Sequence, residues 1–214
     1  MNHIISFRGI RTSIAAVLAV ISSATFAAGD APRPTICNRA CWDARAPSGG
    51  ISTMGSLTRA IVHHSAGNEW NTGGLSDSKA DVRAIQNFQM NSNGWSDVGY
   101  HYLIDKFGNI FEGRAGSNTG LPRGAHDADN TNSFGFCCMG YFHPSVNNVP
   151  SAALLDGLYD IIAWRMPSSW TPYGSPGGSY GELGNTIGRV DAHRRVKSTA
   201  CPGDGLYALS LIHI

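Results

Sequence analysis

The chain has 214 residues, of which 42% are hydrophobic and 14% are charged, and its formal net charge is +1. A chain of this length and composition can bury one substantial core, so we expect a single domain. The net charge is too small to hold a polyanion by counterion release, which excludes nucleic acid as a partner.

The first 27 residues have the pattern of an export signal. Arg8 and Arg11 precede an apolar run over residues 14–21, and small residues follow up to Ala27. The apolar run is too short to span a bilayer well. We therefore expect residues 1–27 to be a cleaved signal peptide and the remainder to be exported, either periplasmic or secreted, without stable membrane insertion. A retained N-terminal anchor is the alternative.

Five cysteines are consistent with an oxidising compartment but leave one thiol over: Cys37, Cys41, Cys137, Cys138 and Cys201. Four of them could form two disulfides, with three connectivities that sequence does not separate. Cys137 and Cys138 are adjacent in an apolar run typical of a strand, so their side chains should point to opposite faces and not pair with each other. We favour a Cys37–Cys41 disulfide, with Cys201 as the unpaired cysteine.

The segment after the signal is rich in proline and glycine. Residues 28–50 are expected to run along the surface as an irregular arm. Residues 59–65 (RAIVHHS) then form a short apolar and β-branched run, which predicts a buried strand at the start of the main domain, residues 51–208.

A first helix is predicted to begin near Ser78. Asp81 follows three residues later, as in a capping box, and Gly94 would end the helix. Apolar residues continue at helical spacing on one face: Val82, Ile85 and Phe88.

The middle of the chain alternates strand and helix signals. Residues 99–114 hold two runs of aromatic and branched residues separated by residues 106–109, which predicts a hairpin. Residues 133–142 form a third apolar run, short enough for a central strand. A clear amphipathic helix follows Ser151 and ends at Pro167. Its apolar face is predicted to contain Leu154, Leu155, Leu158, Ile161 and Ile162.

The remaining segments complete the expected fold. Residues 168–184 are a loop rich in glycine, proline and serine, and residues 186–193 form a last short strand. Strands interleaved with helices predict an α/β class, with one central mixed β-sheet of about five to six strands flanked by two to three main helices. The last six residues, 209–214 (LSLIHI), match a translated sequencing-adapter end and are expected to be a non-native tail.

A candidate metal site follows from the histidines and the unpaired cysteine. Zinc accepts imidazole nitrogen and thiolate sulfur, and catalytic sites use three protein ligands so that a fourth position stays open. One residue of the doublet His63–His64, together with His193 and Cys201, supplies such a set. A buried thiol near a surface histidine is the alternative explanation for this spacing.

Four stretches in this order resemble the peptidoglycan recognition proteins and the phage lysozyme-type amidases: IVHHSAG, WSDVGYHYLIDKFGNIFEGR, GAHDADNTNSFGFCCMGYF and AHRRVKSTACPGDGLY. CWDARAP is also similar to the N-terminal segment of that family, so the resemblance covers about residues 39–207. These relatives are zinc-dependent N-acetylmuramoyl-L-alanine amidases. The resemblance therefore implies a zinc cofactor and peptidoglycan or muropeptides as partners. We expect a monomer.

The resemblance also assigns roles to residues. It implies that His63, His193 and Cys201 bind zinc, with His64 as a packing residue or one that supports the ligands. Tyr100 and Thr199 match positions where a side chain can stabilise the developing oxyanion. Lys197, near Thr199 but out of register, is interpreted as a solvated loop lysine.

Two further residues are implied as substrate contacts. His126 in GAH and Arg114 after FEG fall where family members line the peptide groove. The family's frequent Gly-Trp after this arginine is replaced by Ala115 and Gly116, so the sequence does not predict which stem peptide is preferred.

Three functions from different classes stay open at this point. They are a zinc amidase, a non-catalytic peptidoglycan-binding module, and a metal-free cysteine hydrolase that uses Cys201 and His193. Non-catalytic relatives typically lose the zinc cysteine, and this chain retains both Cys201 and Tyr100, which favours the amidase.

Overall fold

The structure is a computed structural model that describes residues 31–67, 73–167 and 170–210. The predicted signal peptide and most of the predicted non-native tail lie outside the described residues. Within the described part of the chain, no helix combines the length and apolarity that crossing a membrane requires.

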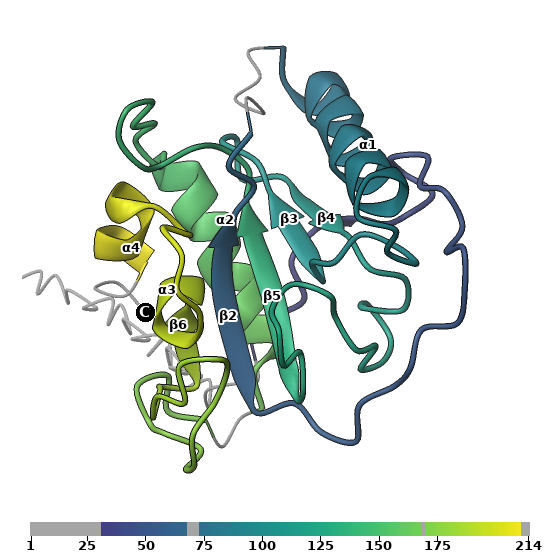
Figure 1. Ribbon diagram of the computed structural model, residues 1–214. Coiled ribbons are helices and arrows are strands. Elements are labelled where there is room, and N and C mark those ends of the chain that lie inside the picture. The colour runs from purple at the N-terminus through teal and green to yellow at the C-terminus, as the bar shows by residue number, and fades with distance from the viewer. Residues whose placement is uncertain (1–30, 68–72, 168–169, 211–214) are drawn as a thin grey trace, which may run out of the picture.

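One six-stranded mixed sheet organises the fold, as the sequence predicts (Figure 1). Its order is β1-β4-β3-β5-β2-β6. The β3–β4 pair is the predicted hairpin and is antiparallel, whereas all the other neighbouring strands are parallel. The strands are β1 (Ile36–Cys37), β2 (Arg59–His64), β3 (Tyr102–Ile104), β4 (Ile110–Glu112), β5 (Ser133–Cys138) and β6 (Val190–Ala192).

Helix α2 (Ala152–Arg165) covers one face of the sheet, as predicted. Ser151 is its N-cap and accepts a hydrogen bond from the backbone N–H of Leu154, which satisfies a donor that the first turn leaves unpaired. The helix lies against the back of the sheet in Figure 1. It buries a continuous apolar core. That core includes Leu154, Leu158, Ile161 and Ile162 from the helix and Val62, Tyr102, Phe134 and Phe136 from the strands.

Helix α1 (Leu75–Asn91) covers part of the other face, but its predicted start was wrong. The helix begins three residues before Ser78, after Gly74, whose φ of 84° is a conformation that glycine adopts without strain. The Ser78 hydroxyl donates to Asp105 and so ties the helix to the β3–β4 turn. Phe88 is 61% exposed and does not join the buried face that the helical spacing predicts.

The N-terminal arm is more ordered than an irregular surface segment. Ile36 and Cys37 add strand β1 to the edge of the sheet beside β4. Trp42 is fully buried, and its indole N–H donates to the Glu112 carbonyl oxygen. The arm therefore contributes to the core on the α1 face, which holds Trp42, Val82, Ile85, Leu103, Phe111 and Cys137.

The cysteines are arranged as the sequence predicts. Cys37 and Cys41 form a disulfide. Cys137 belongs to the core on the α1 face and Cys138 to the core on the α2 face, so adjacent strand residues point to opposite sides. Cys137, Cys138 and Cys201 are all free and buried, so the second disulfide that four cysteines would allow is not formed.

Candidate metal centre

Three side chains converge at the carboxyl ends of the parallel strands. His63 is the penultimate residue of β2, and His193 opens the short helix α3 (His193–Val196) directly after the neighbouring strand β6. Cys201 lies in the turn before α4 (Asp204–Ser210). One ligand atom from each of His63, His193 and Cys201 lies within 4.8 Å of the others, so the structure brings the predicted trio together.

The group is compact and largely shielded from solvent. The Cys201 sulfur lies 3.8 Å from His63 Nδ1, and the centroids of the His63 and His193 rings are 4.4 Å apart. His63 and Cys201 are buried, and His193 is partly buried. The backbone N–H of His64 donates to the Cys201 sulfur at 3.3 Å, a contact that favours the thiolate.

Burial sets the protonation of these groups. It lowers the pKa of His63 well below the usual range of an imidazole, and the neighbouring His193 and His126 lower it further. Burial also raises the pKa of the Cys201 thiol to about 12, despite the hydrogen bond from His64. The cluster therefore offers a neutral imidazole at His63 and a thiol that needs a bound cation to lose its proton at neutral pH.

The donor set fits a zinc ion. Two imidazoles and one thiolate are ligands that zinc accepts, and three protein ligands leave one position for water or substrate. His193 Nε2 is buried and faces the Asp127 carboxylate at 3.6 Å, slightly beyond hydrogen-bond distance. The chemistry of the three donors, rather than an unpaired atom, is what fits a zinc ion.

The second histidine of the doublet points elsewhere. The His64 ring stacks on Tyr141 with centroids 5.5 Å apart and contacts Phe142, a member of the core on the α2 face. Burial lowers the pKa of His64 to about 4. His63 therefore joins the cluster, and His64 packs against aromatic side chains.

The two residues implied as oxyanion donors lie beside the cluster. The Tyr100 ring centroid is 5.3 Å from that of His63. Thr199 is partly buried, and its hydroxyl oxygen accepts a hydrogen bond from the backbone N–H of Cys201 at 3.2 Å. Lys197 instead forms an ion pair with Glu182 at 3.0 Å.

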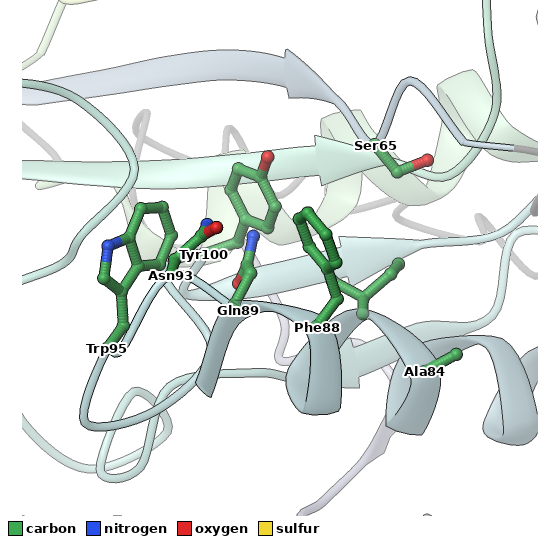
Figure 2. A pocket seen from close by; sticks show the side chains of 8 residues that line it. Ser65, Ala84, Phe88, Gln89, Asn93, Trp95 and Tyr100 are labelled. Atoms are coloured by element: carbon green, nitrogen blue, oxygen red, sulfur yellow. The ribbon is translucent and has the colours of Figure 1, made fainter. Parts of the chain in front are cut away.

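Two cavities flank Tyr100. The first, of about 260 Å³, reaches the cluster and is lined by residues that include His126, Asp127 and His193. The second, of about 410 Å³, extends towards α1. Figure 2 shows Phe88 and Gln89 projecting from the helix into this second cavity, with Tyr100 opposite and its hydroxyl directed away from α1. Trp95 and Tyr100 line both cavities, so the two are neighbours, and His193 of the cluster lines the first. We call the two neighbouring cavities together the groove.

The residues implied as substrate contacts are both buried. His126 lies with its Nδ1 atom 3.0 Å from His63 Nε2. Arg114 donates from its guanidinium group to the Val98 carbonyl oxygen at 3.0 Å, in the segment that leads to Tyr100. A direct contact of either residue with substrate stays a prediction.

Sequence reasoning missed one charged neighbour of the cluster. The carboxylate of Asp127 is buried, with one oxygen 3.6 Å from His193 Nε2. Asp127 directly follows the GAH motif, and this position was the only available signal. The exposed Phe88 and the partly buried Trp95 of the groove carry no sequence signal that separates them from ordinary helix and loop residues.

Fold and site together define an α/β protein with a candidate metal centre of two histidines and one cysteine. Residues 54–204 match the family profile described as N-acetylmuramoyl-L-alanine amidase. Peptidoglycan-recognition protein SD of Drosophila simulans is 34% identical over 178 residues, which cover 81% of this chain and 83% of the relative. The chain belongs to the family of peptidoglycan recognition proteins and type 2 N-acetylmuramoyl-L-alanine amidases.

Solved structures agree with this assignment. The crystal structure of Drosophila PGRP-SD matches with a TM-score of 0.65 at 30% identity, covering 82% of this chain and 92% of that one. A Drosophila PGRP-LB mutant in complex with tracheal cytotoxin matches with a TM-score of 0.62 at 27% identity, covering 81% of this chain and 90% of that one.

Proposed function

We propose that the protein is an exported zinc-dependent amidase that hydrolyses the bond between N-acetylmuramic acid and L-alanine in peptidoglycan. The observation that carries this proposal is the group formed by His63, His193 and Cys201, whose ligand atoms lie within 4.8 Å of one another beside the groove. When bound there, zinc would supply Lewis-acid polarisation of the amide carbonyl and activation of a water molecule.

The groove supports peptidoglycan or a muropeptide as the substrate. It runs from the cluster past Tyr100 and Trp95 to the α1 helix, and aromatic and amide side chains line it. A similar protein, the PGRP-LB mutant, is described in complex with tracheal cytotoxin. We place the scissile amide next to the cluster and the rest of the ligand along the groove, where His126 lines one wall. Arg114 stays a predicted contact of the ligand.

Tyr100 and Thr199 are the residues to which we assign stabilisation of the transition state. Both carry hydroxyl groups beside the cluster, and Tyr100 lines both cavities. A hydroxyl donor aimed at the carbonyl oxygen stabilises the negative charge that develops there as water attacks. The partly enclosed site strengthens such hydrogen bonds, because the local dielectric constant is lower than that of water.

A metal-free cysteine hydrolase is the weaker candidate. Cys201 lies within reach of His63 and His193, but burial raises the pKa of its thiol to about 12. Nucleophilic cysteines have a lowered pKa, because the thiolate and not the thiol attacks. The environment of Cys201 therefore suits a metal ligand better than a nucleophile.

Mass spectrometry of digested peptidoglycan tests the proposal. Purified protein is incubated with sacculi in the presence of zinc or of a chelator. We expect free stem peptides with an L-alanine amino terminus and intact glycan strands, formed only with zinc. Binding of sacculi without any release of peptides would identify a non-catalytic binding module. Release that survives chelation but not thiol alkylation would identify the cysteine hydrolase.

A further inference from the structure

His63 has two ring nitrogens with different neighbours. Its Nδ1 atom faces the Cys201 sulfur at 3.8 Å, whereas its Nε2 atom lies 3.0 Å from His126 Nδ1. Only Nδ1 is therefore placed to bind a cation together with Cys201. A metal-binding nitrogen must present a lone pair, so its hydrogen has to reside on the other nitrogen of the ring.

The contact with His126 can hold His63 in that form. The His63 Nε2 and His126 Nδ1 atoms are 3.0 Å apart, a distance at which one ring donates a hydrogen bond and the other accepts it. A neutral imidazole has one N–H and one lone pair, so it can fill either role. If His63 Nε2 donates to His126 Nδ1, then His63 Nδ1 is free for a metal, and the hydrogen of His126 lies on Nε2.

The far side of His126 is built to accept this hydrogen. Its Nε2 atom lies 3.4 Å from the Ser133 hydroxyl oxygen, at the first residue of β5. The Tyr180 hydroxyl, from the loop after α2, donates to the same oxygen at 2.7 Å. His126, Ser133 and Tyr180 are all buried, so solvent does not compete for these hydrogen bonds.

Backbone packing fixes the position of the His126 ring. A Cβ atom added at Gly135 of β5 would lie 2.4 Å from His126 Cγ, and one added at Gly124 would lie 2.5 Å from His126 Cδ2. Both positions need glycine, because any side chain would displace the ring. The ring thus fills a space bounded by two backbone segments and is held between His63 and Ser133.

We propose that His126 is a positioning residue that, together with Ser133 and Tyr180, fixes the His63 ring so that Nδ1 faces the metal site. This inference rests on the proposed zinc centre and assigns His126 a role through His63. Outer hydrogen-bond partners of metal-binding histidines typically change metal affinity by about 10–100-fold when they are lost.

Zinc affinity, measured by competition with a chromophoric chelator, tests the proposal without relying on turnover. We expect His126→Leu to bind zinc about 10–100-fold more weakly than the wild type. His126→Asn, whose side-chain oxygen can occupy the place of Nδ1 and accept from His63, should restore most of the affinity. A purely structural role would not favour Asn over the similarly sized but apolar Leu. Equal zinc affinity in the wild type and His126→Leu would overturn the proposal.

Two variants that each remove only a hydroxyl group test the same proposal with less risk of misfolding. Tyr180→Phe removes only the hydroxyl that reaches Ser133, and we expect a measurable loss of zinc affinity that is smaller than in His126→Leu. Tyr102→Phe is the matched control, because it also removes one buried hydroxyl, which donates to the Ser117 carbonyl oxygen on the α2 face. Zinc affinity should be unchanged in Tyr102→Phe, and an equal loss in both variants would contradict the proposal.

Nitrogen-15 NMR of the zinc-free protein separates this inference from the proposed function. We expect the His63 signals to show a hydrogen on Nε2 and a lone pair on Nδ1, and this preference to disappear in His126→Leu. The opposite tautomer in the wild type would overturn the inference. A wild-type protein that shows the expected tautomer but binds no zinc would overturn the zinc amidase and leave the role of His126 in orienting His63 in place.

Discussion

The two faces of the sheet show how one set of strands serves two purposes. On the face covered by α2, successive strands contribute apolar side chains to a continuous core. On the other face, α1 packs on Leu103, Phe111 and Cys137, and the end of β2 carries His63. In Figure 1, α1 lies over the β3–β4 part of the sheet, whereas α3 lies beside β2. The candidate site lies on the α1 face of the sheet, beside the groove that borders α1.

The His63–His64 doublet shows what this difference teaches. The two residues are adjacent and both buried, yet one joins a metal-type cluster and the other stacks on Tyr141. Strand geometry alone separates their roles, because neighbouring side chains point to opposite faces. The predictions below compare the two sides in pairs, beginning with the largest expected effect.

Substitution of His63 and of His64 should have opposite effects on zinc binding. We expect His63→Ala to abolish peptidoglycan hydrolysis and to weaken zinc binding by more than the roughly 100-fold upper range for an outer hydrogen-bond partner. His64→Ala should keep zinc binding and lose about 1–2 kcal/mol of unfolding free energy, because it removes buried ring packing. Metal titration and denaturant unfolding measure the two effects. The reverse pattern would assign the ligand to His64.

The tyrosines of the same segment give a second pair. Tyr100→Phe should lower kcat by about 10²–10³-fold while zinc stays bound, which is the typical cost of one lost oxyanion donor. Tyr102→Phe should leave kcat unchanged and cost about 1–3 kcal/mol of stability, because it leaves the buried Ser117 carbonyl oxygen unsatisfied. Digestion of sacculi at wild-type rate by Tyr100→Phe would remove the hydroxyl from the mechanism.

A change on the α2 face should affect folding only. Ser151→Ala removes the side-chain cap of α2, so we expect a loss of about 1 kcal/mol in unfolding free energy. Zinc affinity and kcat, measured well below the unfolding temperature, should match those of the wild type. A large drop in kcat would show that the α2 face and the site are coupled.

The smallest effect is expected at the surface between α3 and α4. A hydrogen bond from Arg194 is the main cause that lowers the pKa of the exposed Asp204. Because the folded pKa lies below the unfolded one, this contribution to stability is present above the unfolded pKa and is lost as the pH falls through the folded pKa. Asp204→Asn should therefore lower the Tm of the zinc-free protein slightly at pH 7 and not at strongly acidic pH. A Tm difference that persists in acid would contradict this origin.

Regular apolar spacing, caps and hairpin patterns predict most of the fold from the sequence. The apolar spacing of α2, its Ser151 cap and the aromatic runs of the β3–β4 hairpin are strong local signals, and the structure has all three. The start of α1 is different, because Ser78 and Asp81 have capping-box spacing but lie inside a helix that begins after Gly74. A tertiary contact between Ser78 and Asp105 uses the serine that the pattern assigns to the cap.

In the candidate site, the sequence predicts the three ligands but not the residues that support them. The resemblance predicts His63, His193 and Cys201, and the structure brings them together, because the family motifs fix where each follows its strand. The contacts of His126 with His63 and of Tyr180 with Ser133 join residues that are 63 and 47 positions apart. No local pattern marks such partners, so the network around the ligands is visible only in the folded chain.

Cobalt substitution tests the central claim most directly. Titration of the metal-free protein with Co²⁺ should give one ion per chain and a thiolate-to-metal absorption band in the near ultraviolet. We expect the band to disappear in Cys201→Ser and to persist in Cys138→Ala, which removes a buried thiol on the opposite face. A protein that binds no ion, or a band that is unchanged in Cys201→Ser, would contradict a metal centre formed by His63, His193 and Cys201.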